Sequence, residues 1–312
     1  SNGKHAFIGR CCLSVADMVS ASTERRASTF TDDAARARKG AAYKGGGQLF
    51  VDSCVVLPRP SFFEFLSSGC ELEFVVAVDM TASNGNPQSL DSLHYVGPDG
   101  GEQNEYALAI ESVGRVLEYY SATRMYSAFG FGGVPPGHTV PSHCFPLNGN
   151  EAAPEVAGIR GVLDVYRHAI HTVRLSGPTL FAPTIQQASA VAASMMTTDP
   201  RRQKYFVLLL LTDGLLGDMD NTVDAIVAAA ELPLSIIIVG VGHENFSAMQ
   251  ALDGDSTRLR SWRGATASRD IVQFVPLRDL AGRGAHALAK EVLAELPVQL
   301  LAYMAAKGIM PV

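Results

Sequence analysis

The chain of 312 residues has little of what marks nucleic-acid-binding and membrane-spanning proteins. Lysine and arginine number 25 against 31 aspartates and glutamates, so the formal net charge is −6 and no basic excess is available to bind nucleic acid. The longest apolar runs, such as 205–211 and 236–241, are far shorter than the roughly 20 residues that cross a bilayer. We also expect no secretory signal peptide.

Cysteine is scarce and unpatterned. The five cysteines are an odd number and form no CxxC pair, which predicts free thiols in a reducing cytosol and no zinc site. Charged residues make up only 18% and hydrophobic residues 47%, which excludes global disorder and is enough for a large core. The length predicts two domains or one large α/β domain. Because Ser1-Asn2-Gly3 lacks an initiator methionine, we expect a piece of a longer protein.

Residues 1–58 differ in composition from the rest of the chain. A short apolar run at 6–8 is followed by an Arg/Ala/Ser-rich stretch at 20–47 and a second strand-like run at 48–56. Two strands cannot bury a core by themselves. We therefore expect 1–58 to be the remnant of a β domain with 20–47 mobile, followed by a linker at 59–70.

From Glu71 onward, strand-like and helix-like segments alternate. Continuous apolar runs predict strands, apolar spacing of three and four residues predicts helices, and alternation of the two predicts a mostly parallel sheet with helices on both faces. Ligands of such sheets lie at the carboxyl ends of the strands. The predicted strands are 74–78, 125–131, 205–211, 234–241 and 271–276, and the predicted helices are 104–120, 159–173, 183–195, 222–232, 246–252 and 280–306, the last bent or broken near Pro297.

Oxygen-bearing side chains follow two of these strands. Asp79, Thr81 and Ser83 come directly after the first strand, and Asp213 comes directly after 205–211. Thr179 lies in a loop between them that introduces a helix. Hard oxygen ligands with few carboxylates suit Mg²⁺ or Mn²⁺. An open coordination position on such an ion would attract an external carboxylate, which is binding chemistry rather than catalysis.

This set of residues resembles a known site. Asp79-x-Thr81-x-Ser83, Thr179 and Asp213 look like the metal-ion-dependent adhesion site (MIDAS) of von Willebrand factor A domains, with Thr81 at a position where serine is usual. Longer segments resemble copines, and the resemblance covers roughly 70–312. It implies a Rossmann-like von Willebrand factor A domain at 71–312 that binds Mg²⁺, Mn²⁺ or Ca²⁺ through these five residues. The segments are 79–87, 92–95, 145–150, 177–183, 235–242, 252–255 and 270–276.

The copine resemblance extends to the first residues and to function. Copines carry two C2 domains before the A domain, and 5–9 and 48–56 resemble strands of the second, which implies that 1–58 is its C-terminal remnant. The resemblance implies a non-enzymatic, metal-dependent interaction domain whose protein partners supply an acidic side chain. It also implies a cytoplasmic parent protein, active in membrane trafficking and signalling. Calcium in the C2 domains, whose binding loops this chain lacks, would recruit that parent to phospholipid at the plasma membrane.

Two other functions are compatible with parts of the pattern. A metal held by two carboxylates could activate water for phosphate hydrolysis, but no base or basic clamp is grouped near these loops. Plant copine-like A domains joined to a RING finger act in ubiquitin transfer, but a RING finger needs clustered cysteines and histidines with zinc spacing, which this chain lacks.

Several other residues have structural interpretations. His94 is expected to be a packing or hydrogen-bonding residue rather than a base. Asp218 and Asp220 are expected to cap the helix that begins at Thr222 or to add negative potential near Asp213. His168 and His171 are three apart on a predicted helix with no third ligand, which favours a solvated face. The glycine-rich step at 130–133 fits a turn rather than a nucleotide-binding loop. Cys70 and Cys144 are interpreted as packing residues.

Overall fold

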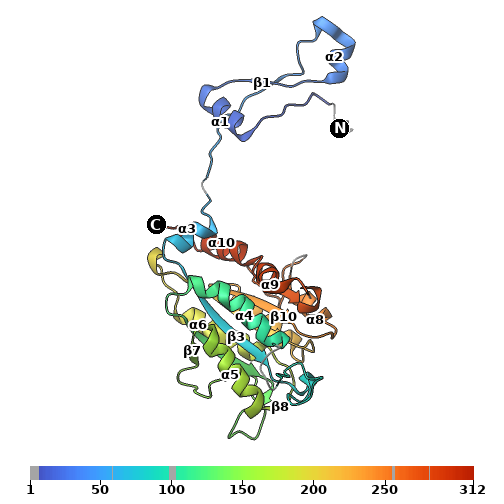
Figure 1. Cartoon of the computed structure of the whole chain (residues 1–312). Helices are drawn as coiled ribbons and strands as arrows, with labels where there is room; N and C mark the ends of the chain where they lie inside the picture. The colour runs from blue at the N-terminus through green and yellow to red at the C-terminus, as the bar shows by residue number, and fades with distance from the viewer. Residues whose placement is uncertain (1–6, 58, 98–102, 255–256, 281) are drawn as a thin grey trace. The chain divides into compact units, whose positions relative to one another are not determined.

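The computed structural model describes residues 7–57, 59–97, 103–254, 257–280 and 282–312. The chain divides into two compact units, Ser1–Arg59 and Pro60–Val312, which are described separately (Figure 1). Among the described residues, no helix has both the length and the apolar character needed to cross a membrane. The five cysteines are free, as predicted.

The described residues of the first unit form two α-helices and a minimal two-stranded sheet. Helix α1 begins with a capping box in which Ser14 and Asp17 exchange hydrogen bonds. The stretch 20–47, expected to be mobile, therefore contains regular structure, whereas the run 48–56 is a strand only in its first two residues. The partner strand β1 has only two residues, so the rest of that run has no ladder to join. The elements are α1 (Val15–Glu24), β1 (Ser28–Thr29), α2 (Asp33–Lys39) and β2 (Gln48–Leu49).

The second unit is built on one mixed sheet in the order β11-β10-β9-β3-β4-β6, with β7 also pairing with β4. The main strands are parallel, and β6 and β7 run antiparallel to β4. When the strands are numbered by their order in the chain, this strand order is that of the doubly wound, Rossmann-type sheet. The strands are β3 (Glu71–Asp79), β4 (Met125–Phe131), β6 (Phe145–Pro146), β7 (Glu155–Ala157), β9 (Lys204–Thr212), β10 (Leu234–Gly240) and β11 (Val272–Pro276), and β5 (Gly133–Val134) pairs with β8 (Arg174–Leu175) outside it.

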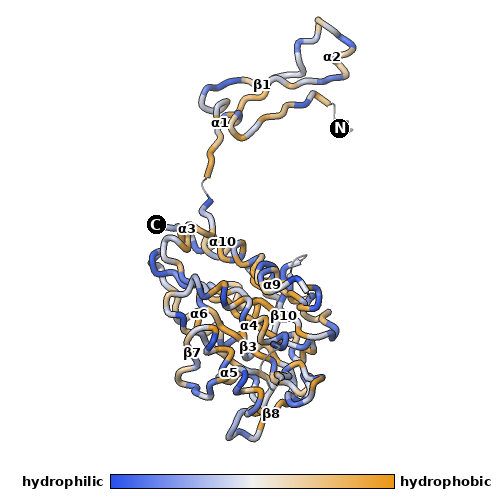
Figure 2. Tube along the Cα trace, viewed as in Figure 1, coloured by the Kyte–Doolittle hydropathy of each residue, from blue (hydrophilic) through white to orange (hydrophobic). Residues whose placement is uncertain are grey.

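Helices cover both faces of the sheet, as predicted. Along β3, Val76 and Val78 pack into a core with α4, α5, α9 and α10, whereas Val75 and Ala77 pack into a second core with α6, α7 and α8. The tube of Figure 2 is strongly hydrophobic along β3 and β10. The helices are α3 (Phe62–Ser67), α4 (Glu105–Leu117), α5 (Gly158–Thr172), α6 (Ala182–Ser194), α7 (Met219–Ala229), α8 (Ser247–Leu252), α9 (Gly284–Val292) and α10 (Leu296–Ala306).

All five predicted strands and all predicted helices of this unit are present. The long terminal helix is broken into α9 and α10, with Pro297 in the first turn of α10, where its missing N–H costs nothing. Two features differ from the prediction. The short strands β6 and β7 are not among the predicted strands, because they have too few residues to show a recognisable alternation of apolar and polar side chains. The stretch 59–70, expected as a linker, contains α3, whose Phe65 is buried in the core beside α10.

Candidate metal centre

The predicted site lies where the direction of the sheet connections reverses. Strands β3 and β9 are parallel neighbours, with Val78 opposite Leu211, so Asp79 and Thr212 end adjacent strands at the same edge. The next strand after β3 is β4 on one side, and the next after β9 is β10 on the other. Such a switch point leaves a crevice in which doubly wound proteins bind ligands.

Asp79 is fully buried and held by hydrogen bonds from the loop that follows it and from the end of the neighbouring strand β9. Its Oδ1 accepts hydrogen bonds from the Thr81 backbone N–H at 2.9 Å and the Thr81 hydroxyl at 2.5 Å. Its Oδ2 accepts a hydrogen bond from the Thr212 hydroxyl at 2.8 Å. The carboxylate is therefore fixed in orientation, with its charge already partly stabilised.

The hydroxyls continue this row of oxygens toward solvent. The Thr81 Oγ1 lies 2.9 Å from Oγ of Ser83, which is exposed. Gly132, in the predicted turn after β4, makes room for them. It has a φ of 75°, and a Cβ there would lie 2.3 Å from the Thr81 methyl carbon. A side chain at this position would displace Thr81, so the glycine-rich step serves the site.

Asp213 is the unusual member of the group. Its side chain is 1% exposed, yet neither carboxylate oxygen has a hydrogen-bond partner among the described residues. Burial raises the pKa of Asp213, and the nearby Glu244 adds to the rise, while the Ser83 hydroxyl, close by without ordinary hydrogen-bond geometry, opposes it. A buried carboxylate without a partner is costly, and a cation would remove that cost.

The two carboxylates also act on each other. Burial, and then the charge of Asp213, raise the pKa of Asp79 to about 7, against the effect of the Thr81 and Thr212 hydrogen bonds. Ionisation of both carboxylates together is disfavoured, because they are buried near each other at one edge of the sheet and their like charges repel. A divalent cation between them would reverse that preference.

The Thr179 loop is fastened to both of the other loops. The Ala82 backbone N–H donates to the Ser176 carbonyl at 2.7 Å, and the Gly217 N–H donates to the Thr179 carbonyl at 2.8 Å. Thr179 itself is 6% exposed, and the peptide bond before Pro178 is cis. The structure thus brings all three predicted loops together at one edge.

Asp218 is a capping residue, as predicted, but it caps a different helix. Its carboxylate accepts hydrogen bonds from the backbone N–H groups of Phe181 at 3.0 Å and Ala182 at 3.1 Å, at the start of α6. It also accepts one from the Thr222 hydroxyl at 3.0 Å. Asp218 therefore ties α6 to the loop after β9 and is not available as a metal ligand.

A buried polar layer supports Asp79 from behind. The His94 ring lies 2.9 Å from the Asp79 carbonyl through Nε2 and 2.9 Å from the Tyr166 hydroxyl through Nδ1. Because a carbonyl only accepts, Nε2 carries the proton and Nδ1 accepts. The ring stacks on Tyr106, with 4.4 Å between ring centroids. His94 is a hydrogen-bonding residue, as predicted, with no nitrogen free to act as a base.

Sequence reasoning missed the roles of two residues. Neither Thr212 nor Asn84 is among the residues that the sequence pattern assigns to the site. Asn84 is 1% exposed, donates to the Thr81 carbonyl at 3.2 Å and accepts from the Tyr106 hydroxyl at 2.6 Å. The signal for Thr212 was available, since a polar residue ends an otherwise apolar strand.

The donor set fits a hard divalent cation. No group of three or more His, Cys, Asp or Glu side chains comes together in the part of the chain that the structure describes, so hydroxyls and water would have to complete the coordination. Two carboxylates and neutral hydroxyls match the oxygen preference and the charge of Mg²⁺ or Mn²⁺. The unpartnered Asp213 is the feature that most calls for such an ion.

Comparison with known proteins identifies a family. The family model for Copine matches residues 92–312. Protein BONZAI 1 of Arabidopsis thaliana is 44% identical over 100% of this chain and 53% of its own length. Protein BONZAI 2 of the same plant is 43% identical over 99% of this chain and 52% of its own length. The chain thus spans about half the length of these curated relatives.

Solved structures give weaker likenesses. Manganese-loaded TRAP protein of Plasmodium vivax has a TM-score of 0.43 at 12% identity, covering 70% of this chain and 71% of that one. Proximal thread matrix protein 1 of the mussel byssus has a TM-score of 0.39 at 13% identity, covering 75% of this chain and 49% of that one. Likenesses at this level say nothing about the ligands of the present chain.

Proposed function

The chain belongs to the copine family, and from that premise we propose that its α/β unit is a metal-dependent protein-interaction domain. The observation that carries the proposal is the buried, unpartnered carboxylate of Asp213 beside the hydrogen-bonded carboxylate of Asp79. This pair lies at the switch point of a doubly wound sheet, where such folds bind ligands.

Asp79, Thr81, Ser83, Thr179 and Asp213 would hold the metal. When bound, the ion supplies a positive charge and an open coordination position for a carboxylate of the partner. Asp79 is oriented by Thr81 and Thr212, so it would present its charge without further rearrangement. Mg²⁺ or Mn²⁺ fits the small number of carboxylates best, with Ca²⁺ as the third candidate.

The role of the whole protein is also part of the proposal. Residues 1–58 would be the end of a second C2 domain, and calcium bound by the C2 domains would recruit a cytoplasmic protein to phospholipid at the plasma membrane. The A domain would then deliver protein partners there, in membrane trafficking or signalling. What supports this is family membership alone, since the chain spans about half of its relatives.

A hydrolytic function is less well supported. Metal-assisted hydrolysis needs a group that activates or positions water. His94 is the histidine in contact with Asp79, and both of its ring nitrogens are engaged with protein groups. We therefore do not propose an enzymatic activity for this site.

The test uses Mn²⁺ as both ligand and reporter. Bound Mn²⁺ with exchangeable water enhances water-proton relaxation, and we expect this enhancement with the chain of residues 1–312. Added glutarate should reduce it by displacing water, whereas uncharged glutaramide should leave it unchanged. Thr179→Val should weaken Mn²⁺ binding, whereas Thr172→Val on the exposed face of α5 should not.

Two outcomes would contradict the proposal at different steps. If the chain binds no Mn²⁺, the metal site itself is wrong. If it binds Mn²⁺ but glutarate leaves the relaxation unchanged, the site holds a metal that is closed to external carboxylates, and the interaction function is wrong.

A further inference from the structure

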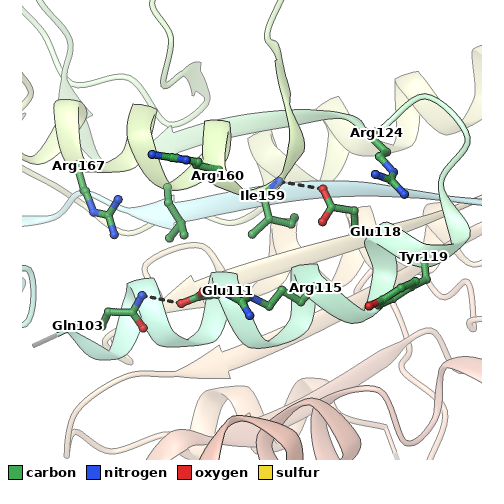
Figure 3. A pocket seen from close by; sticks show the side chains of 10 residues that line it. Gln103, Glu111, Arg115, Glu118, Tyr119, Arg124, Ile159, Arg160 and Arg167 are labelled. Atoms are coloured by element: carbon green, nitrogen blue, oxygen red, sulfur yellow. Dashed lines mark hydrogen bonds and ion pairs between the residues drawn. The ribbon is translucent and has the colours of Figure 1, made fainter.

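A basic groove lies between α4 and α5, outside the candidate metal centre. It encloses about 580 Å³, within the range of ligand-binding clefts (Figure 3). Ile159 and Leu163 contribute buried apolar surface to it. Its charged side chains are four arginines and two glutamates, in a chain whose net charge is −6. The full lining is Gln103, Glu111, Arg115, Glu118, Tyr119, Arg124, Ile159, Arg160, Leu163 and Arg167.

Both glutamates are already engaged by the protein. Glu111 accepts a hydrogen bond from the Gln103 side chain at 2.6 Å and forms an ion pair with Arg115, and these contacts lower its pKa. Glu118 accepts from the Ile159 backbone N–H at 3.4 Å, at the start of α5. Each glutamate thus has a partner in the protein, and the four arginines of the groove outnumber the two glutamates.

The remaining arginines are available to a ligand. Arg124 and Arg160 form no side-chain hydrogen bond or ion pair with the residues that the structure describes. Arg167 pairs with Asp164 at 3.5 Å, and both side chains are largely exposed, so this pair is weak. Guanidinium groups bind carboxylates and phosphates through two parallel hydrogen bonds. The groove is thus built to bind an anion.

The spacing of the arginines favours an extended anion. Arg160 and Arg167 are seven residues apart on α5, a rise of about 10.5 Å. Figure 3 shows Arg167 and Arg124 at opposite ends of the groove with Arg160 between them, so the guanidiniums do not converge on one point. Carboxylates on one side of an extended peptide recur about every 6.8 Å, so two or three of them span a length comparable to this row. Tyr119, 83% exposed, offers apolar contact at one end.

We propose that this groove binds an acidic, extended segment of a partner protein without a metal ion. The site is separate from the metal centre and goes beyond the function proposed above, because its charge comes from the protein's own guanidinium groups. Two acidic recognition sites on one unit would let the protein select partners by two separate clusters of carboxylates.

The test measures binding of a fluorescein-labelled peptide in which six glutamates alternate with alanines, by fluorescence anisotropy in EDTA. The chain of residues 1–312 should bind it, with affinity falling as NaCl is raised, and should not bind the glutamine version. Arg124→Glu/Arg160→Glu should weaken binding at least tenfold. The matched control, Arg201→Glu/Arg202→Glu, makes the same change in net charge at exposed arginines outside the groove and should stay within twofold.

Further variants and ligands separate the groove from the metal centre and from a phosphate-binding site. Asp79→Ala should bind the peptide like the unaltered chain, so a failure of the metal proposal leaves this one testable. If the double variant fails to fold, Arg160→Gln is the milder substitute, and it should weaken binding about threefold. Equal loss in both double variants would overturn the proposal. So would selective binding of phosphoinositide-containing vesicles or inorganic phosphate without the peptide.

Discussion

Two buried charged side chains lie at opposite ends of the central sheet, and the fold treats them differently. Arg269 lies beside the amino ends of β9 and β10 and is 6% exposed. Asp213 follows the carboxyl end of β9 and is 1% exposed. One is surrounded by partners from the protein itself, whereas the other has none among the described residues.

The guanidinium of Arg269 is bonded through all three of its nitrogens. Nε donates to the Ala230 carbonyl at 2.9 Å, and the other two nitrogens donate to further acceptors. Its carbon also lies 5.3 Å from the centre of the Tyr303 ring, in cation–π range. The remaining acceptors are the Tyr205 hydroxyl and the carbonyls of Gln299, Leu232 and Leu234.

This contrast separates structural from functional charge. A buried charge whose hydrogen bonds are all satisfied has a structural role. Here the guanidinium of Arg269 links α7, β10 and α10. A buried charge without partners destabilises the free protein, so its presence indicates that a ligand from outside the polypeptide stabilises it. The two ends of the sheet should therefore respond to substitution in opposite directions.

The largest effect is expected at the amino end. Arg269→Met removes the donors of four backbone carbonyls and should lower the free energy of unfolding by about 3–5 kcal/mol. Urea unfolding followed by circular dichroism measures this loss, which Mg²⁺ should not change. Arg258→Met, at an exposed arginine of the same region, is the control and should cost under about 1 kcal/mol. Similar losses in both variants would remove the contrast.

The second effect concerns the layer behind Asp79 and appears at acid pH. Burial lowers the pKa of His94 from its usual value of 6.5 to about 4. Between these two pH values His94 is protonated in the unfolded chain but not in the folded chain. The contribution of His94 to stability should therefore be complete above pH 6.5 and be lost toward pH 4, by on the order of 3 kcal/mol. The raised pKa of Asp79 acts in the opposite direction over this range, so the His94 contribution is measured as the difference between variants.

His94→Gln should be less stable at neutral pH, because it loses ring contacts, but this deficit relative to the unaltered chain should shrink as the pH falls from 7 to 4. The control is His168→Gln, at an exposed histidine of α5, which should keep the pH dependence of the unaltered chain. Urea unfolding in EDTA from pH 7 to pH 4 checks both, and parallel pH curves for all three proteins would rule out His94 as the cause.

The third effect has the opposite sign to the first. Without metal at pH 8, Asp213→Asn should raise the free energy of unfolding by about 1–2 kcal/mol, because it removes an unpartnered buried charge. Asp218→Asn makes the same chemical change five residues later and should lower it by about 1 kcal/mol, since that carboxylate caps α6. Thermal unfolding in EDTA compares them, and loss of stability in both would show that Asp213 is satisfied after all.

The smallest effect is at the exposed part of the amino end. Lys204 on β9 pairs with Glu73 at 2.5 Å and with Glu71 at 3.2 Å, and the Lys204 and Glu71 side chains are partly exposed, whereas Glu73 is largely buried. Lys204→Met should therefore cost under about 1 kcal/mol, and less in 0.5 M NaCl. A loss comparable to that of Arg269→Met would mean that burial does not govern these charges.

Much of the fold was predictable from local patterns. Apolar runs such as 205–211 have the length and flanking turns of a strand buried on both faces. Pro297 can only begin a helix or break one. The convergence of the candidate site residues was predictable because strand ends meet at one edge once the sheet is parallel.

The rest depends on long-range contacts that leave no local signal. Arg269 is a single arginine before a strand, and nothing in its neighbours predicts acceptors from three other segments. The same holds for the basic groove, where Arg124 and Arg160 lie 36 positions apart in the sequence and line one groove because the Gly158 N–H at the start of α5 donates to the Arg124 carbonyl. Residues 48–56 illustrate the converse, a strand-like run without a partner along most of its length.

The central claim is that Asp213 lacks a partner because a divalent cation completes the site. Isothermal titration calorimetry of the chain of residues 1–312 with MnCl₂ and with MgCl₂ tests it directly, with Asp213→Asn and Asp218→Asn as the paired variants. We predict one metal ion bound per chain, binding lost in Asp213→Asn and retained in Asp218→Asn. Absence of binding to the unaltered chain, or equal affinity in Asp213→Asn, would contradict the account.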